Sequence, residues 1–242
     1  MGVDAASLPV LTPGRRRGFE HLDDPATPAA LRERSLRDVR RANRLLGGTH
    51  AVLREVTRIL PLLGDAGTIL DVGTGLGDIP AAAQRLARRR AVSLVTYGVD
   101  EAATLAPLMY AILDESVCAD ARRLPFADAS LDIVTCSQVL HHFEDADIPI
   151  VLRELSRVAR HAVIVSDLRR SWIAVGGFWA AAWPLRFHPV TRHDGVASIL
   201  RGFTPRELDL HVRVATARIP VVRRHPGFRL TATWSPSPGP HP

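Results

Sequence analysis

The hydrophobic positions of this 242-residue chain form short and long segments that alternate over its middle part. Short apolar runs lie at 68–72, 92–99, 116–119, 131–136 and 162–166. Runs of this length, bounded by turn residues, are typical of buried strands. The sequence therefore predicts five strands in this region.

Apolar residues at helical spacing fill the segments 79–90, 103–113 and 148–158, which lie between these strands. Strands that alternate with helices are joined by right-handed crossovers and form a mostly parallel sheet covered on both faces. The pattern predicts an α/β, doubly wound fold.

Helix signals also precede the first strand. Thr27 is a plausible N-cap with Pro28 at the first helical position, and Gly47-Gly48 would end that helix. Thr49 would then cap a second helix that runs to about residue 60. We expect 19–65 to form a helical cap.

The last third of the chain breaks the alternation. A helix is expected to start at Thr204-Pro205, and 211–222 and 227–234 are predicted as strands joined by 223–226. Two close strands indicate an antiparallel C-terminal hairpin at the edge of the sheet, which brings the total to seven strands. The segment 171–203 becomes an insertion after the fifth strand.

Both ends of the chain are rich in proline. Residues 1–18 combine Pro, Gly and Arg, and 235–242 alternate Pro with small residues, so both segments are expected to be disordered. A single domain is then expected over 19–234.

Charge is distributed unevenly along the chain. The net charge of +6 comes from Arg alone: 1–60 carry +4, 61–210 carry −3 and 211–242 carry +5. A nucleic-acid enzyme more often has a basic face across its core, so this distribution argues against nucleic acid as a partner. No apolar run is long enough for a membrane span and no signal peptide is evident, so a cytoplasmic protein is expected.

A glycine-rich turn follows the first strand of the sheet. The sequence Asp-Val-Gly-Thr-Gly-Leu-Gly at 71–77 ends a strand and opens a helix, an arrangement that presents free backbone amides to a nucleotide. Its glycines follow the pattern G-x-G-x-G, not the dinucleotide pattern G-x-G-x-x-G. Two acids accompany it: Asp71 opens the turn, and Asp100 ends the next strand, where a carboxylate can bind ribose hydroxyls.

These features resemble class I S-adenosylmethionine-dependent methyltransferases. The segment 69–77 is similar to their first motif and 119–126 to the motif on the adenine side. The segment 130–143, with Leu-His-His-Phe at its end, resembles the ubiquinone/menaquinone-biosynthesis and small-molecule branch. The resemblance covers about 66–168 and implies a Rossmann-like sheet and S-adenosyl-L-methionine as the cofactor.

The resemblance also implies roles for individual residues. The methionine part of the cofactor would lie against Asp71, Gly73, Thr74, Gly75 and Gly77. The ribose would bind Asp100 or its neighbour Glu101. The adenine would lie at Asp120 and Ala121, and Ser137 and Gln138 would line the cofactor.

Histidines at the carboxyl edge of the sheet are the candidate catalytic residues. His141 and His142 follow the fourth strand, and either is a possible general base or a packing residue. His193 lies in the insertion beside Asp194, which could orient it or could cap a helix instead.

Aromatic side chains are concentrated in the insertion. They are a candidate wall for a flat apolar acceptor, with a core helix or a dimer contact as the alternative. The expected acceptor-side residues are Trp172, Phe178, Trp179, Trp183 and His188.

The leading hypothesis is O- or C-methylation of a small aromatic or polyketide-like metabolite by a monomer or homodimer. The alternatives are methylation of RNA or protein, prompted by the Arg-rich ends, and a cofactor-binding protein without methyl transfer. No Pro-Pro segment of amino-directed nucleic-acid enzymes follows the fourth strand, and no Pro-Cys nucleophile occurs. No metal site is expected, since Cys118 and Cys136 cannot form one and no Asp/Asn cluster is evident.

Overall fold

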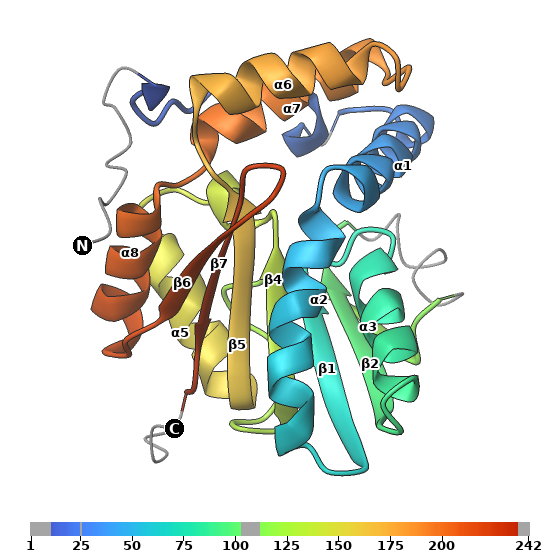
Figure 1. Cartoon of the computed structure of the whole chain (residues 1–242), viewed down its shortest axis with the longest axis vertical. Coiled ribbons are helices and arrows are strands. Elements are labelled where there is room, and N and C mark those ends of the chain that lie inside the picture. Colours follow the sequence, from blue (N-terminus) through green and yellow to red (C-terminus); the bar gives the residue numbers. More distant parts are fainter. Residues whose placement is uncertain (1–10, 25, 103–111, 237–242) are drawn as a thin grey trace, which may run out of the picture.

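A computed structural model describes residues 11–24, 26–102 and 112–236 of the chain (Figure 1). Within these residues a seven-stranded sheet has the order β3-β2-β1-β4-β5-β7-β6. β7 runs antiparallel to both of its neighbours, whereas the pairs among β1 to β5 are parallel. The strands are β1 (Ala66–Val72), β2 (Ser93–Asp100), β3 (Glu115–Cys118), β4 (Leu131–Ser137), β5 (Ala159–Leu168), β6 (Val221–His225) and β7 (Arg229–Trp234). The expected doubly wound, mostly parallel sheet is confirmed.

Helices cover both faces of this sheet. α2 (Gly48–Ile59) and α3 (Asp78–Arg88) pack on one face, and α5 (Ile148–Val158) and α8 (Pro205–Thr216) pack on the other. Successive strand residues point to opposite faces of the sheet: Ile69 packs with α2 and α3, and the next residue, Leu70, packs with α5. Burial on both faces explains why the central strands are continuously apolar.

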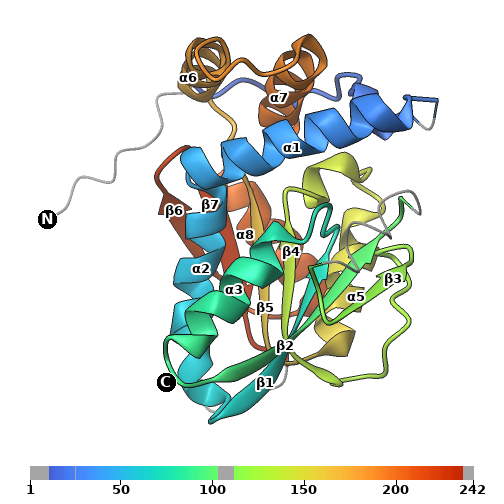
Figure 2. The ribbon, with the colours of Figure 1, turned by 90° about the vertical axis from the view of Figure 1, so that its right-hand side faces the viewer.

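Three further helices lie across the carboxyl edge of the parallel strands (Figures 1 and 2). They are α1 (Ala29–Leu45), α6 (Trp172–Ala182) and α7 (Pro189–Arg201), preceded by the short 3-10 helix η2 (His21–Asp23). Asp38 joins α1 to α7, because it accepts hydrogen bonds from His188 N (2.8 Å) and Thr191 Oγ1 (3.3 Å). The expected insertion after the fifth strand thus forms α6 and α7 and covers this edge together with α1.

The expected helix caps at the N-terminal end are wrong. Pro28, not Thr27, is the N-cap of α1, and the Thr27 hydroxyl donates to His21 O instead. Gly47, not Thr49, is the N-cap of α2 and has a φ of +84°. A Cβ at Gly47 would lie 2.7 Å from Pro226 O, so the corner between the two helices needs a glycine both for its conformation and for its close approach to the β6–β7 turn.

The strand expected at 211–222 is also wrong. The reciprocal hydrogen bonds of Thr204 and Glu207 form a capping box that starts α8, and the helix continues to Thr216. Leu208, Val212 and Ala215 are its buried residues, at helical spacing. Consequently β6 begins only at Val221 and includes most of the expected loop 223–226.

Three expected features fall partly outside the described residues. The helix expected at 103–113 is one, since 103–111 are not described, and the C-terminal segment 235–242 is another, since 237–242 are not described. At the N-terminus, 11–18 are described and make specific contacts: Arg15 Nε donates to Arg201 O (2.7 Å), and Arg170 Nε donates to Pro13 O (2.7 Å). This part of the segment expected to be disordered therefore lies against the domain. Among the described residues, no helix combines the length and the apolar character needed to cross a membrane.

Candidate functional site

A cavity of about 930 Å³ lies at the carboxyl edge of the sheet, beneath α1, α6 and α7, which we call the cap helices. Its floor is the turn after β1, the end of β2 and the segment after β4. Its roof includes Leu36 and Val39 of α1, Phe178 of α6 and Ile199 of α7. Ligands bind at this edge in open α/β sheets, where the loops after the parallel strands diverge.

The glycine turn is fixed by hydrogen bonds to β2. The amides of Gly73 and Thr74 donate to Val99 O at 2.8 and 3.0 Å. The amide of Gly75 donates to Asp100 Oδ2 at 2.9 Å, so the two expected cofactor-binding regions are joined directly. All three glycines of the turn have positive φ.

The three glycines nevertheless meet different surroundings. A Cβ at Gly73 would lie 2.2 Å from Val139, and one at Gly77 would lie 3.1 Å from Leu113, so both positions are closed by protein. A Cβ at Gly75 would meet only Leu36, at 3.9 Å. Gly75 is therefore the glycine whose missing side chain leaves room for a ligand.

Asp71 is buried beneath the turn. Its Oδ1 accepts a hydrogen bond from Thr135 Oγ1 at 2.6 Å, and only 1% of the residue is exposed. Burial raises the pKa of Asp71 to about 7, against the opposing effect of the Thr135 hydrogen bond. In the ligand-free protein this carboxyl group is thus largely protonated at mildly acidic pH.

The raised pKa of Asp71 predicts a pH dependence of the free energy of unfolding. The unfolded chain ionises Asp71 near pH 4 and the folded protein only near pH 7, so the folded state binds the extra proton between these values. The free energy of unfolding should therefore fall as pH rises through this window, by roughly 2–4 kcal/mol at most. Asp71→Asn removes the titration, so its stability relative to wild type should rise from pH 4.5 to 8 in urea unfolding.

The control is Asp65→Asn, at an exposed position, which should follow the wild-type curve. A parallel pH dependence of wild type and Asp71→Asn would contradict this prediction.

Most of the expected cofactor residues line the cavity. These are Asp71, Gly73, Thr74, Gly75, Asp100, Glu101, Ala121, Ser137 and Gln138. Gly77 and Asp120 do not line it. The Asp120 carboxylate instead pairs with Arg122, whose Nη2 lies 2.8 Å from Oδ2, and this hydrogen bond holds the pKa of Asp120 below its usual value.

The segment after β4 holds polar atoms of two kinds. The buried hydroxyl of Ser137 has no hydrogen-bond partner, which leaves it for a ligand, whereas the hydroxyl of Thr74 in the turn acts on the carboxyl group of Asp71 and lowers its pKa. The Gln138 side chain is already engaged: its amide donates to Asn43 of α1, and its carbonyl accepts from Arg229 Nη1 at 2.6 Å. Gln138 therefore joins the cap to β7.

His141 is held by a buried carboxylate. Its Nδ1 lies 2.6 Å from Asp167 Oδ1, and both side chains are almost fully buried. Burial acts to raise the pKa of Asp167, but His141 and the amide of Leu168 hold it below its ordinary value. Nε2 of His141 is buried without a partner, and the residue is part of the lining of the cavity.

His142 has a carboxylate partner of its own, Asp23 of η2. Its Nδ1 lies 2.7 Å from Asp23 Oδ1, and Arg201 Nη1 donates to Asp23 Oδ2 at 2.6 Å. Burial opposes ionisation of Asp23, yet the bonds from His142 and Arg201 lower its pKa to about 2. Burial likewise acts to lower the pKa of His142, but Asp23 and the charge of Glu20 raise it.

Asp167, Asp23 and Glu20 were not among the residues expected from the sequence. Asp167 carries the same signal as Asp100, an acid at the carboxyl end of an apolar strand, and could have been found. Glu20 and Asp23 lie in a short polar segment, and their contact with His142 is made across more than a hundred residues.

The aromatic wall expected on the acceptor side lies mostly elsewhere. Only Phe178 lines the cavity, where it packs against Gly195. Trp172, Trp179 and Trp183 are 40%, 58% and 56% exposed. These tryptophans lie outside this cavity, and their role on the acceptor side stays a prediction.

His188 and His193 also lie apart from this cavity. His188 is the N-cap of α7, where its Nδ1 accepts from Val190 N. His193 lines a second surface hollow with Trp179 and Trp183. Its neighbour Asp194 lies within α7, whose N-cap is His188, so the capping alternative is not what the structure has. Asp194 Oδ1 lies 3.0 Å from His193 Nδ1, and the carboxylate also accepts the amides of His21 and Leu22 and so anchors η2.

The chain was compared with known proteins. Residues 70–165 match a family model described as a methyltransferase domain. No curated protein sequence matches the chain. The matched segment contains the glycine turn, the end of β2, the two histidines and most of β5, which are the elements that form the floor of the cavity.

Solved structures share the fold at low sequence identity. A putative S-adenosyl-L-methionine-dependent methyltransferase from Methanococcus maripaludis has a TM-score of 0.55 and 11% identity, over 84% of this chain and 92% of that one. Magnesium protoporphyrin IX methyltransferase from Synechocystis, solved with S-adenosylmethionine, has a TM-score of 0.55 and 10% identity, over 90% of this chain and 98% of that one. A possible histamine N-methyltransferase from Thermotoga maritima has a TM-score of 0.55 and 15% identity, over 87% of this chain and 100% of that one. At these identities the likeness concerns the fold.

Proposed function

We propose that this chain, whose residues 70–165 match a methyltransferase domain, is a class I S-adenosylmethionine-dependent methyltransferase that methylates a small aromatic or polyketide-like molecule bound beneath the cap helices. The observation that carries this proposal is the Asp167–His141 pair. Its buried, unpartnered Nε2 lines the same cavity as the glycine turn.

The residues of the turn fit the cofactor that the family uses. Gly75 leaves open space above the backbone, and the hydroxyl of Ser137 is buried without a partner. Asp100 ends β2 at the rim of the same turn, where its carboxylate retains acceptor capacity for ribose hydroxyls. S-adenosylmethionine supplies a methyl group on a sulfonium sulfur, so the protein mainly has to align donor and acceptor and exclude water.

His141 is suited to take a proton from the acceptor. Donation of the Nδ1 hydrogen to Asp167 selects the tautomer in which Nε2 carries the lone pair, and His141 lines the cavity. A hydroxyl or an acidic carbon of the acceptor can give its proton to this atom as the methyl group moves from sulfur to oxygen or carbon. Asp167 is then a positioning residue, because it acts through His141.

The roof of the cavity favours an apolar acceptor. Its lining from the cap and adjoining segments includes Leu22, Leu36, Val39, Phe143, Phe178 and Ile199. Such a surface binds a flat or branched hydrocarbon body, and the histidines provide the polar end. A macromolecular acceptor would have to bring the group that receives the methyl through the layer formed by α1, α6 and α7.

Methyl transfer from labelled S-adenosylmethionine tests this proposal. We expect the label to appear in small phenols or hydroxylated polyketides from a panel, and not in RNA or protein offered at equal concentration. The full-length protein should be used, because segments near both ends pack against the domain. Label in RNA or protein, with none in the small molecules, would replace this function with the macromolecular alternative.

A further inference from the structure

The acceptor side of the cavity contains an arrangement that proton transfer alone does not require. Two histidines stand side by side, with ring centroids 4.2 Å apart, and each is bonded through Nδ1 to its own carboxylate. A carboxylate behind each imidazole is the support that metal-binding histidines usually have, since it orients the ring and raises the basicity of the other nitrogen.

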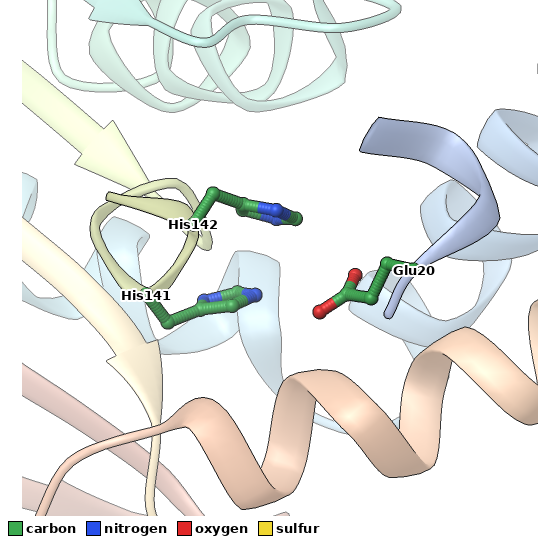
Figure 3. A group of neighbouring side chains, drawn as sticks. All are labelled: Glu20, His141 and His142. Carbon is green, nitrogen blue, oxygen red and sulfur yellow. The ribbon is translucent and has the colours of Figure 1, made fainter. Parts of the chain in front are cut away.

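Glu20 completes the cluster from the opposite side of the cavity (Figure 3). One potential ligand atom from each of Glu20, His141 and His142 lies within 4.8 Å of the other two. Ligand atoms of a bound zinc ion lie within roughly 4 Å of one another, so small side-chain rotations suffice to close the site.

Two buried atoms of this cluster have no hydrogen bond. One is Nε2 of His141, and the other is Oε1 of Glu20, a residue only 2% exposed. Oε1 lies 3.0 Å from Arg201 Nη1 without hydrogen-bond geometry, whereas Oε2 accepts from Ser198 Oγ at 2.9 Å. A buried polar atom left without a partner costs free energy, so Nε2 of His141, which has neither a hydrogen bond nor an ion pair, indicates a ligand at this cluster.

The charge around the two rings also favours a cation. The carboxylates of Glu20, Asp23 and Asp167 lie next to them, and the guanidinium of Arg201 is paired with Glu20 and Asp23. Carboxylates that surround neutral imidazoles make the position favourable for a divalent ion.

We propose that Glu20, His141 and His142 bind a divalent transition-metal ion on the acceptor side of the cavity. Two imidazoles and one carboxylate suit zinc, cobalt, iron or manganese better than magnesium or calcium, which prefer oxygen ligands. Three protein ligands leave at least one coordination position open, as in catalytic metal sites.

The role of this ion rests on the proposed function. An acceptor hydroxyl bound at the open position loses its proton more readily, because the ion stabilises the resulting oxyanion. The proton passes to solvent, the oxyanion bonds to the methyl carbon, and the electron pair of the sulfur–methyl bond remains on sulfur. In this ion-bound form Nε2 of His141 is a ligand, and in the metal-free form it accepts the proton itself.

The binding of cobalt to chelator-treated protein tests the site without cofactor or acceptor. Calorimetry and the visible absorption of bound Co²⁺ should show one tight site per chain. Glu20→Gln and His142→Gln should each weaken it at least 10–100-fold, the loss that even a supporting residue of a metal site can cause. These two variants spare the buried His141–Asp167 pair and so keep the fold.

Two control variants and one control ligand complete the experiment. His50→Gln, at an exposed position of α2, should bind cobalt like wild type. His193→Gln tests the second group of potential ligands, His21, His193 and Asp194. Binding that survives Glu20→Gln and His142→Gln, or that is lost in His193→Gln, would overturn the assignment. S-adenosylhomocysteine binding by the same variants shows separately that the cofactor site is intact, so the failure of one proposal is distinguishable from the failure of the other.

Discussion

Replacement of His141 by Gln should lower turnover of a small acceptor by roughly 10²–10⁴-fold, the usual contribution of a general acid or base. Gln preserves much of the side-chain volume but cannot take up a proton. Affinity for S-adenosylhomocysteine should remain near the wild-type value, because the glycine turn and Asp100 are untouched. Steady-state rates and calorimetry on the same preparation check both parts of this expectation.

Asp167→Asn should produce a loss of the same order, since Asn no longer selects the imidazole tautomer that leaves Nε2 free. The pH–rate profile should move together with the rate, which a purely structural role of Asp167 would not cause. His193→Gln, outside the cavity, should retain the wild-type rate. A near-normal rate in His141→Gln would remove this residue from the mechanism.

Gly75→Val should abolish cofactor binding without unfolding the protein. A side chain at this position meets only Leu36, so its volume projects into the space reserved for the ligand. The left-handed backbone at Gly75 (φ +54°) adds strain of the order of 1–3 kcal/mol, so thermal unfolding must be measured in parallel.

The neighbouring glycine provides the comparison. Gly73→Val should mainly destabilise the fold, because even a Cβ there comes within 2.2 Å of Val139. If Gly75→Val binds S-adenosylhomocysteine normally, the ligand does not approach this turn, and the assignment of the cofactor site fails.

Features set by short-range pattern were predictable from the sequence. The apolar runs gave the five central strands, and the glycine turn with Asp71 and Asp100 gave the floor of the cavity, because strand ends and the turns that follow them are local in the chain. The position of His141 and His142 after β4 followed for the same reason.

Where local signals conflict, the prediction from sequence fails. The segment 211–222 alternates apolar and polar residues over a few positions, yet the capping box at Thr204 extends α8 through its first half. Likewise, the hydrophobicity of α6 is nearly uniform around the helix, so the sequence does not indicate that Trp179 and Trp183 are exposed.

Contacts between residues far apart in the chain were also not predicted from the sequence. Glu20 and Asp23 reach the histidines only because α7 and η2 are held together by Asp194 and Arg201, contacts that span more than 170 residues. No pattern in a single sequence reports such pairing. The chemistry of His141 and His142 therefore depends on residues that only the fold brings to them.

Calorimetric titration of the wild-type protein with S-adenosylhomocysteine tests the central claim most directly. The cavity floor formed by the glycine turn and Asp100 should give saturable binding of one ligand per chain, and Asp100→Ala should weaken it by about 1–3 kcal/mol through the loss of charge-assisted hydrogen bonds. Binding of NADH in the absence of any binding of S-adenosylhomocysteine would contradict the account.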